Sequence, residues 1–132
     1  MKTFTIEIVT PIKTAFSSEV KSITVPGTVG EFQVLYNHAP LMSTFEVGKI
    51  RINDAEDKEI EFATSGGVIE VLKNKILLLA ASVERIGEID KERAEISAER
   101  ARKRIQERAQ NIDLSRAEAS LARALNRLKY AG

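Results

Sequence analysis

The feature that most constrains the fold of this chain is a change of sequence pattern at Gly87. Before it, apolar and polar residues alternate, as in Phe4, Ile6 and Ile8, and all three prolines fall in this part. After it, apolar residues recur at every third or fourth position, with no proline and no glycine before the terminal one. A repeat of two is typical of strands and a repeat of 3.6 of helices. We therefore predict an all-β domain in residues 1–86 and α-helices in residues 87–132.

Turn signals divide the first part into short strands. Residues 65–67, Ser-Gly-Gly, are expected to form a tight connection between two strands. Residues 76–81 form the longest apolar run, which predicts a buried strand. Turns that recur about every 8–12 residues favour a β-sandwich or a barrel. Aromatic residues make up only 5% of the chain, so the core is expected to be aliphatic.

Alanine-rich stripes in the second part predict two helices. Residues at helical spacing form one stripe in each helix: Ala94, Ala98, Ala101, Ile105 and Ala109, then Leu114, Ala117, Leu121, Ala124 or Leu125, and Leu128. Asn111 and Asp113 between them suit a helix end and a helix N-cap, and the short connection favours an antiparallel hairpin. Alanine buries little apolar area, so we expect the hairpin to be the least stable part of the chain.

Composition and motifs exclude several classes of function. The chain has 20 Lys and Arg against 19 Asp and Glu, too balanced for a general nucleic-acid coat protein. It has no cysteine, so disulfides, thiol nucleophiles and cysteine zinc sites are excluded, and its single His38 cannot form a histidine-rich metal site. It carries neither a Walker A motif nor a dinucleotide fingerprint, and no Ser-His-Asp arrangement is recognisable. We expect a protein that is not an enzyme, holds no metal and, without a long apolar run or a signal peptide, meets a membrane only through partners.

One run of residues carries a resemblance to a known family. Residues 26–41 read Pro-Gly-Thr-Val-Gly-Glu-Phe-Gln-Val-Leu-Tyr-Asn-His-Ala-Pro-Leu, which resembles the signature of the epsilon subunit of F-type ATP synthases. Gly48-Lys49-Ile50 and residues 65–71, 89–90 and 123–128 resemble the same family, in the same order along the chain. The family usually has Pro-Gly where Tyr36 and Asn37 stand, and Asn tolerates the left-handed backbone that such a turn requires.

The resemblance implies a sandwich of about ten strands followed by an antiparallel helical hairpin. It also implies a non-catalytic rotor subunit of the central stalk in a proton-translocating F-type ATP synthase. Such a subunit binds gamma and the c-subunit ring, on the cytoplasmic side of the inner (plasma) membrane rather than the stromal side of a thylakoid. The loop residues expected to contact the ring are Val29, Gly30, Glu31, Asn37 and His38.

Arginines on the predicted helices indicate an anionic partner. Arg116, Arg123 and Arg127 share one helix face, and several arginines stand four residues apart, where like charges repel. One possible partner is ATP, bound as a regulatory ligand and not hydrolysed, because residues 89–94, Ile-Asp-Lys-Glu-Arg-Ala, match the motif of ATP-binding members of the family. The resemblance places that site at Glu84, Ile89, Asp90, Arg93, Ala94, Arg100, Arg123 and Arg127.

The second possible partner is the acidic surface of the alpha and beta catalytic subunits. An opened hairpin would reach it through Arg116, Arg123 and Arg127 and inhibit ATP hydrolysis. Since the same arginines would hold ATP in the folded hairpin, ATP binding is expected to favour the non-inhibitory state. An alternative function is a small adaptor whose basic hairpin binds nucleic acid or another acidic partner. The balanced charge and the lack of aromatic residues in 87–129 count against that alternative.

Overall fold

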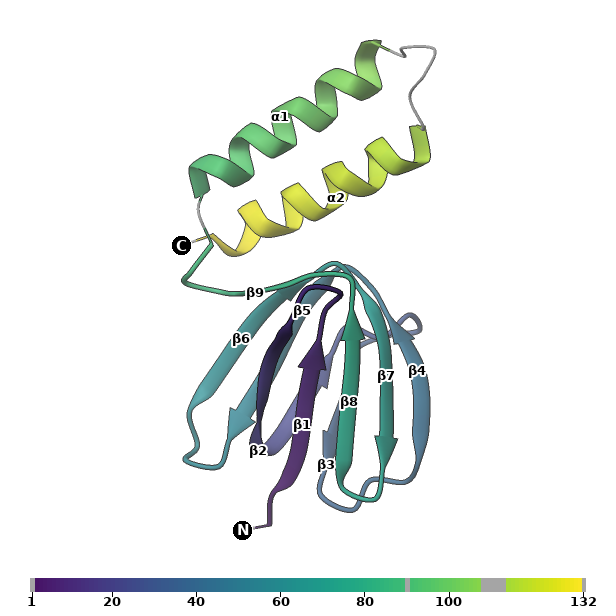
Figure 1. Ribbon diagram of the computed structural model, residues 1–132, viewed down its shortest axis with the longest axis vertical. Helices are drawn as coiled ribbons and strands as arrows, with labels where there is room; N and C mark the ends of the chain where they lie inside the picture. Colours follow the sequence, from purple (N-terminus) through teal and green to yellow (C-terminus); the bar gives the residue numbers. More distant parts are fainter. Residues whose placement is uncertain (1, 90, 108–113, 132) are drawn as a thin grey trace. The chain divides into compact units, whose positions relative to one another are not determined.

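The computed structural model describes residues 2–89, 91–107 and 114–131. The chain divides into two compact units, Met1–Arg85 and Ile86–Gly132, of which the first holds nine strands and the second two helices in the described residues (Figure 1). The strands are β1 (Phe4–Val9), β2 (Thr14–Val25), β3 (Phe32–Leu35), β4 (Leu41–Phe45), β5 (Gly48–Asp54), β6 (Glu59–Thr64), β7 (Gly67–Leu72), β8 (Lys75–Ala80) and β9 (Val83–Arg85). The helices are α1 (Lys91–Glu107) and α2 (Leu114–Tyr130), which confirms the predicted fold class.

The first unit is a β-sandwich in which one long strand, β2, belongs to both layers. The first half of β2 pairs with β1, and the second half pairs with β3 on one side and β5 on the other. One layer therefore has the strand order β4-β7-β8-β1-β2, and the other has the order β3-β2-β5-β6-β9. Within the first layer, β1 and β8 run parallel, whereas the other neighbouring strands are antiparallel.

The shared strand explains the difference between the nine observed strands and the ten expected. The pairing register of β2 shifts between Val20 and Ser22, where the strand passes from one layer to the other. Val20 lies opposite Phe4 of β1 and also opposite Asp54 of β5. If the two halves of β2 are counted separately, each layer has five strands.

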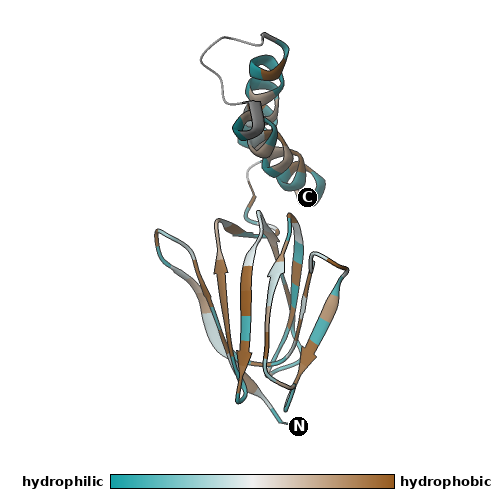
Figure 2. Cartoon of the chain, turned by 90° about the vertical axis from the view of Figure 1, so that its right-hand side faces the viewer, coloured by the Kyte–Doolittle hydropathy of each residue, from teal (hydrophilic) through white to brown (hydrophobic). Residues whose placement is uncertain are grey.

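Because apolar and polar residues alternate along the strands, aliphatic side chains fill the space between the two layers, as the sequence predicts. Phe4, Ile6 and Ile8 of β1 are buried, while the residues between them face outward. The largest fully buried apolar side chains, all β-branched or leucine, are Ile6, Ile8, Val20, Ile23, Val25, Val34, Ile50, Ile52, Ile69 and Leu78. Figure 2 shows these hydrophobic segments along the strands.

The Ser-Gly-Gly segment forms the tight connection between β6 and β7 that was predicted. Gly66 has a φ of +102°, a conformation that L-residues rarely adopt. A Cβ atom added to Gly67 would overlap the carbonyl oxygen of Leu79 on the neighbouring strand β8. The two glycines therefore let the chain cross between layers while β7 approaches β8 closely.

The sandwich has two ends, which carry different loops. At one end lie the β7–β8 turn with Asn74, the β5–β6 turn, the β3–β4 loop and the first residues of the chain. At the other end lie the β1–β2, β2–β3, β4–β5, β6–β7 and β8–β9 connections, joined by pairs such as Gly27↔Phe45 and Phe45↔Gly67. We call these the Asn74 end and the Gly66 end.

The second unit is an antiparallel hairpin of two 17-residue helices (Figure 1). Five alanines are buried: Ala94, Ala98 and Ala101 of α1, and Ala117 and Ala124 of α2. This confirms the alanine stripes, whereas the predicted capping residues Asn111 and Asp113, like Ala109, lie outside the described residues. Neither α1 nor α2 is long and apolar enough to span a membrane.

An ion pair ties the bend of β2 to the β5–β6 turn. The Lys21 ammonium lies 2.8 Å from Asp57 Oδ1, and the Lys21 side chain is only 12% exposed. The hydrogen bond from Lys21, together with its positive charge, lowers the pKa of the Asp57 carboxyl below its ordinary value of 3.8. Asp57 also has a φ of +62°, which Asp and Asn tolerate better than other residues.

This ion pair predicts how stability responds to acid. Because the folded-state pKa of Asp57 is depressed, the pair stabilises the fold above the ordinary carboxyl pKa of 3.8. That contribution is lost as the pH falls through the lowered pKa. We expect Asp57→Asn, which keeps the turn, to be less stable than the native chain at pH 7 and pH 5, and the difference to vanish in stronger acid. Urea unfolding of the full chain at each pH measures it.

Glu56→Gln is the matched control, since the Glu56–Lys58 pair is longer, at 3.6 Å, and both side chains are well exposed. A stability difference between Asp57→Asn and the native chain that stays constant from pH 7 into strong acid would contradict the assignment.

Candidate functional site

The five residues predicted to contact a c-subunit ring fall in two different loops. Val29, Gly30 and Glu31 lie in the β2–β3 loop at the Gly66 end, where Val29 is fully exposed. Glu31 is held by Arg51, whose Nη2 donates to Glu31 Oε1 over 3.0 Å. The loop therefore presents an apolar tip next to an ion pair.

Asn37 and His38 lie in the β3–β4 loop, at the Asn74 end. Asn37 is exposed and has a φ of +63°, which confirms that it occupies a left-handed turn position. Its backbone N–H donates to Asn74 Oδ1 on the β7–β8 turn. His38 is half-buried, with Nδ1 2.7 Å from the carbonyl oxygen of Ala39.

The structure does not bring these five residues together. β3 runs from one loop to the other, so the two groups lie at opposite ends of the sandwich. Strands of six residues, such as β7 and β8, span about 20 Å at the usual rise per residue. The two groups therefore form two separate candidate contacts.

A further candidate contact surface, which the sequence analysis did not predict, lies on the outside of the β4-β7-β8-β1 layer. It is apolar across neighbouring strands, because Val68 lies opposite Leu79, which in turn lies opposite Val9. We call it the outer apolar face and define it by Val9, Met42, Val68, Leu72, Leu77 and Leu79. Met42 is 69% exposed and Leu79 is 50% exposed.

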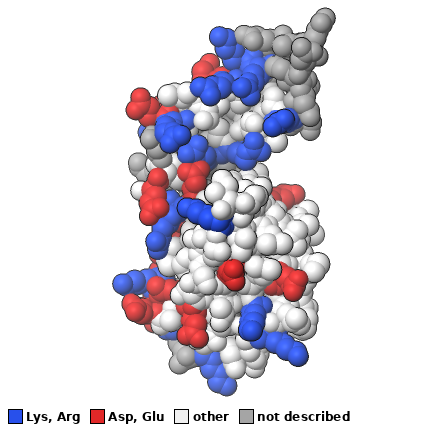
Figure 3. Space-filling model, viewed as in Figure 1, with Lys and Arg blue, Asp and Glu red and all other residues white. Residues whose placement is uncertain are grey.

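The outer apolar face corrects one prediction. Residues 76–81 do not form a strand buried on both sides, because Leu77 and Leu79 point outward while Ile76, Leu78 and Ala80 fill the core. The unbroken apolar run of residues 76–81 could have revealed the outer apolar face, because an antiparallel strand with one solvated face normally alternates apolar and polar residues. In Figure 3 the surface over β1, β8 and β7 carries few charged side chains.

The outer side of the second layer is polar by contrast. Lys49 pairs with Glu61 at 2.7 Å, and Arg51 pairs with Glu31. Thr24, Gln33 and Asn53 line a shallow polar hollow beside them. One outer side of the sandwich thus suits solvent, and the other suits an apolar partner.

The predicted arginines lie on both helices of the hairpin and differ in their exposure. Arg93 and Arg100 are exposed on α1, Arg116 and Arg123 are exposed on α2, and Arg127 is half-buried. Because the helices run antiparallel, the start of α1 lies beside the end of α2, which brings Arg93 and Arg127 to the same end of the hairpin. Arg123 Nη2 donates to Ser120 Oγ over 3.0 Å.

The other residues predicted to bind ATP differ in their exposure and in the unit to which they belong. Ile89 is half-buried just before α1, and Asp90 lies outside the described residues. Ala94 has no exposed area and is one of the buried alanines of α1. Glu84 lies on β9 in the first unit, whereas the arginines belong to the second.

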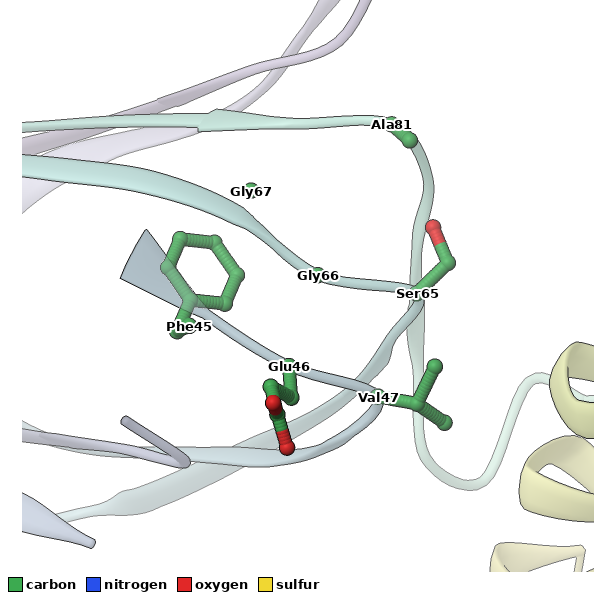
Figure 4. Close-up of a pocket in the computed structure, with 7 residues that line it drawn as sticks. All are labelled: Phe45, Glu46, Val47, Ser65, Gly66, Gly67 and Ala81. Carbon is green, nitrogen blue, oxygen red and sulfur yellow. The ribbon is translucent and has the colours of Figure 1, made fainter. Parts of the chain in front are cut away.

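A pocket of about 600 Å³ opens at the Gly66 end of the sandwich (Figure 4). Its lining residues come from three connections and are mostly apolar or glycine: Phe45, Glu46, Val47, Ser65, Gly66, Gly67 and Ala81. Ser65 Oγ accepts a hydrogen bond from Ser82 Oγ at 2.8 Å, and Glu46 is the single titratable group among these residues. This lining supplies no acid–base pair, and no cluster of metal-ligating side chains occurs in the described parts of the chain.

The chain matches two models of one family. Residues 3–86 match "ATP synthase, Delta/Epsilon chain, beta-sandwich domain", and residues 88–132 match "ATP synthase, Delta/Epsilon chain, long alpha-helix domain". The ATP synthase epsilon chain of Pelotomaculum thermopropionicum is 50% identical over 131 residues, covering 99% of this chain and 97% of the relative. The epsilon chain of Desulforamulus reducens is 41% identical and covers 98% of both chains.

Solved structures share the fold at low sequence identity. A chain from the Euglena gracilis mitochondrial ATP synthase, in a structure of OSCP, F1 and the c-ring, has a TM-score of 0.73 at 18% identity, covering 96% of this chain and 79% of that one. A chain from the central stalk and c-ring of the Tetrahymena thermophila enzyme has a TM-score of 0.54 at 15% identity, covering 64% and 68%.

The separation of the two loops gives a prediction that the cysteine-free chain makes easy to test. If the chain contacts a c-subunit ring, as the sequence leads us to expect, the ring can face only one end of the sandwich, so single cysteines at Val29 and His38 should behave differently towards it in an assembled complex. One of Val29→Cys and His38→Cys should form a disulfide with a cysteine in the ring's exposed loop, and the other should not. Equal crosslinking from both positions would contradict the arrangement, and a cysteine at Gln33, an exposed residue on the polar outer side, is the control.

Proposed function

Because this chain belongs to the ATP synthase delta/epsilon chain family, we propose that it is a rotor subunit of the central stalk, connecting gamma to the c-subunit ring of a proton-translocating enzyme. Members of this family are non-catalytic subunits. Support comes from the full-length match to the family and from similarity to chains of structures that contain a c-ring. In this proposal the chain reaches the membrane only through its partners, on the cytoplasmic side.

The observation that carries this proposal is the outer apolar face. A surface of this kind on a folded domain is typical of a docking site for another protein. Glu7 and Glu70 lie opposite Leu77 in the register of the sheet, so two carboxylates flank the apolar residues. We propose that gamma covers this face with apolar side chains and places basic residues near the two carboxylates.

A charge placed on this face tests the proposal. Leu79→Glu changes an outward, half-exposed side chain, so we expect the fold to keep its unfolding free energy to within about 1 kcal/mol. Burying the new carboxylate against an apolar partner is costly, so binding to gamma should weaken at least tenfold, as measured by titration of the full chain.

Gln33→Glu is the control, because it places the same carboxylate at an exposed position of β3 on the polar outer side of the other layer. Equal loss of gamma binding in both variants, or no loss in either, would refute the assignment of this face.

We further propose that the hairpin is a brake on ATP hydrolysis that ATP binding releases. Guanidinium groups keep their charge and bind polyphosphate oxygens in a bidentate manner, which suits Arg93, Arg100, Arg123 and Arg127. The helices meet through alanines, which bury little area, so opening the hairpin is expected to cost little compared with opening the sandwich. ATP that binds only the folded hairpin would shift the equilibrium away from the open, inhibitory form.

In the open form, Arg116, Arg123 and Arg127 would contact the acidic surface of the catalytic subunits. The alternative, an adaptor whose basic hairpin binds nucleic acid, makes a different prediction. It requires binding to random duplex DNA that weakens steeply with salt.

Calorimetric titration of the full chain with ATP tests the nucleotide part. Saturable binding should weaken at least tenfold in Arg123→Ala/Arg127→Ala, since each hydrogen bond to a charged group contributes about 1.5–3 kcal/mol. The control variant Arg102→Ala/Arg104→Ala removes the same charge from α1 and should bind as the native chain does.

No binding at millimolar ATP would refute the nucleotide part and leave the arginines to a protein partner. The brake itself is tested by the ATPase rate of the reconstituted complex at low ATP, which should rise when residues 87–132 are removed. An unchanged rate would contradict the brake.

A further inference from the structure

Two asparagines from distant parts of the sequence are joined by a pair of hydrogen bonds at the Asn74 end. The backbone N–H of Asn37 donates to Asn74 Oδ1 over 2.7 Å. The side-chain amide of Asn74 donates back to Asn37 Oδ1 over 3.1 Å. The β3–β4 loop is therefore fastened to the β7–β8 turn by a side chain that stands 37 positions further along the chain.

Asn74 is the rigid partner in this pair. Lys73 and Asn74 have φ values of +49° and +60°, and Leu72 pairs with Lys75 across them, which describes a type I′ turn. The carbonyl oxygen of Asn74 accepts a hydrogen bond from the N–H of Thr5 over 3.1 Å, which ties the turn to β1. The Asn74 side chain thus projects from a backbone that is fixed on two sides.

Asn37 belongs to the other partner, a turn over residues 35–38. The N–H of His38 donates to the carbonyl oxygen of Leu35 over 3.2 Å, and Asn37, the third residue of the turn, has a positive φ. Among the four residues only Asn37 has a positive φ, which indicates a type II turn. Type I and type II turns differ in the orientation of their central peptide, here the one between Tyr36 and Asn37.

The bond to Asn74 acts on that central peptide. The Asn37 N–H is part of it, so Asn74 Oδ1 holds the peptide in the type II orientation. Tyr36 is fixed separately, because its ring packs against the core and the Lys2 ammonium lies 5.2 Å from the ring centroid. What the asparagine pair determines is thus the direction in which Asn37 and His38 leave the turn.

We propose that Asn74 is a positioning residue, which orients Asn37 and His38 for contact with a partner subunit of the stalk. This inference rests on the proposed rotor function, since it assumes that the β3–β4 loop meets another subunit. The sheet supplies a rigid base, and the asparagine pair transmits its orientation to the loop. Contacts made by a preoriented loop avoid the entropy lost when a flexible one is fixed.

Asn74→Gly tests the inference in the full chain, because glycine suits a positive φ in a type I′ turn and only the side chain is lost. We expect the amide hydrogen of Asn37 to exchange with solvent at least tenfold faster, as followed by NMR. Asn74→Asp should keep this protection, since a carboxylate still accepts the bond from Asn37. Asn53→Ala is the control, because Asn53 makes a long side-chain bond of 3.5 Å, to Asp57, near the same end. Unchanged exchange in Asn74→Gly would overturn the proposal.

The functional readout is crosslinking to any subunit of the assembled complex, through a photoreactive group attached to a single cysteine at His38 or at Val29. In the Asn74→Gly background we expect the yield from His38→Cys to fall at least threefold and the yield from Val29→Cys, at the other end of the sandwich, to stay the same. A merely structural role for Asn74 would lower both yields together, and that result would overturn positioning.

Two further outcomes separate this inference from the proposed function. Equal crosslinking from His38→Cys with and without the Asn74 side chain would overturn the inference and leave the rotor assignment intact. No crosslink from His38→Cys to any subunit, with Val29→Cys still reactive, would overturn it as well. No crosslink from either position would instead count against the rotor function.

Discussion

The fold depends on the double pairing of β2. Because Val20 lies opposite residues of both β1 and β5, a single strand fixes the spacing and the register of two layers that otherwise share few backbone contacts. The ion pair between Lys21 and Asp57 fastens the same corner. This corner also places the β5–β6 turn beside the start of β1 at the Asn74 end, since Val20 lies opposite both Asp54 and Phe4.

The two outer sides of the sandwich have different chemistry, although the same alternation builds both layers. One side carries ion pairs such as Lys49–Glu61, which solvent hydrates well. The other carries leucine, valine and methionine at the outward positions, where a free-standing domain would have polar residues. This asymmetry gives the sandwich a defined orientation in an assembly, because one side suits burial and the two ends remain for other contacts.

Sequence reasoning predicted the elements well and their spatial neighbours poorly. The alternation in β1, the Ser-Gly-Gly connection, the alanine stripes and the left-handed Asn37 all follow from local rules, and the structure has each of them. The burial of residues 76–81 was overestimated because periodicity does not say which face of a strand meets a partner. The placement of Val29 and His38 at opposite ends, and the pairing of Asn37 with Asn74, depend on tertiary topology, which no local pattern contains.

The parallel pairing of β1 with β8 has a consequence for how the chain is made. Thr5 lies opposite Lys75, so the first strand to leave the ribosome cannot complete its layer until some 70 further residues have followed. The hairpin, by contrast, is built from contacts between residues close in sequence and can form quickly. During most of its synthesis, the incomplete sandwich therefore exposes both its core residues and the residues of its outer apolar face. Rapid capture by a partner or a chaperone would protect the chain from aggregation during that interval.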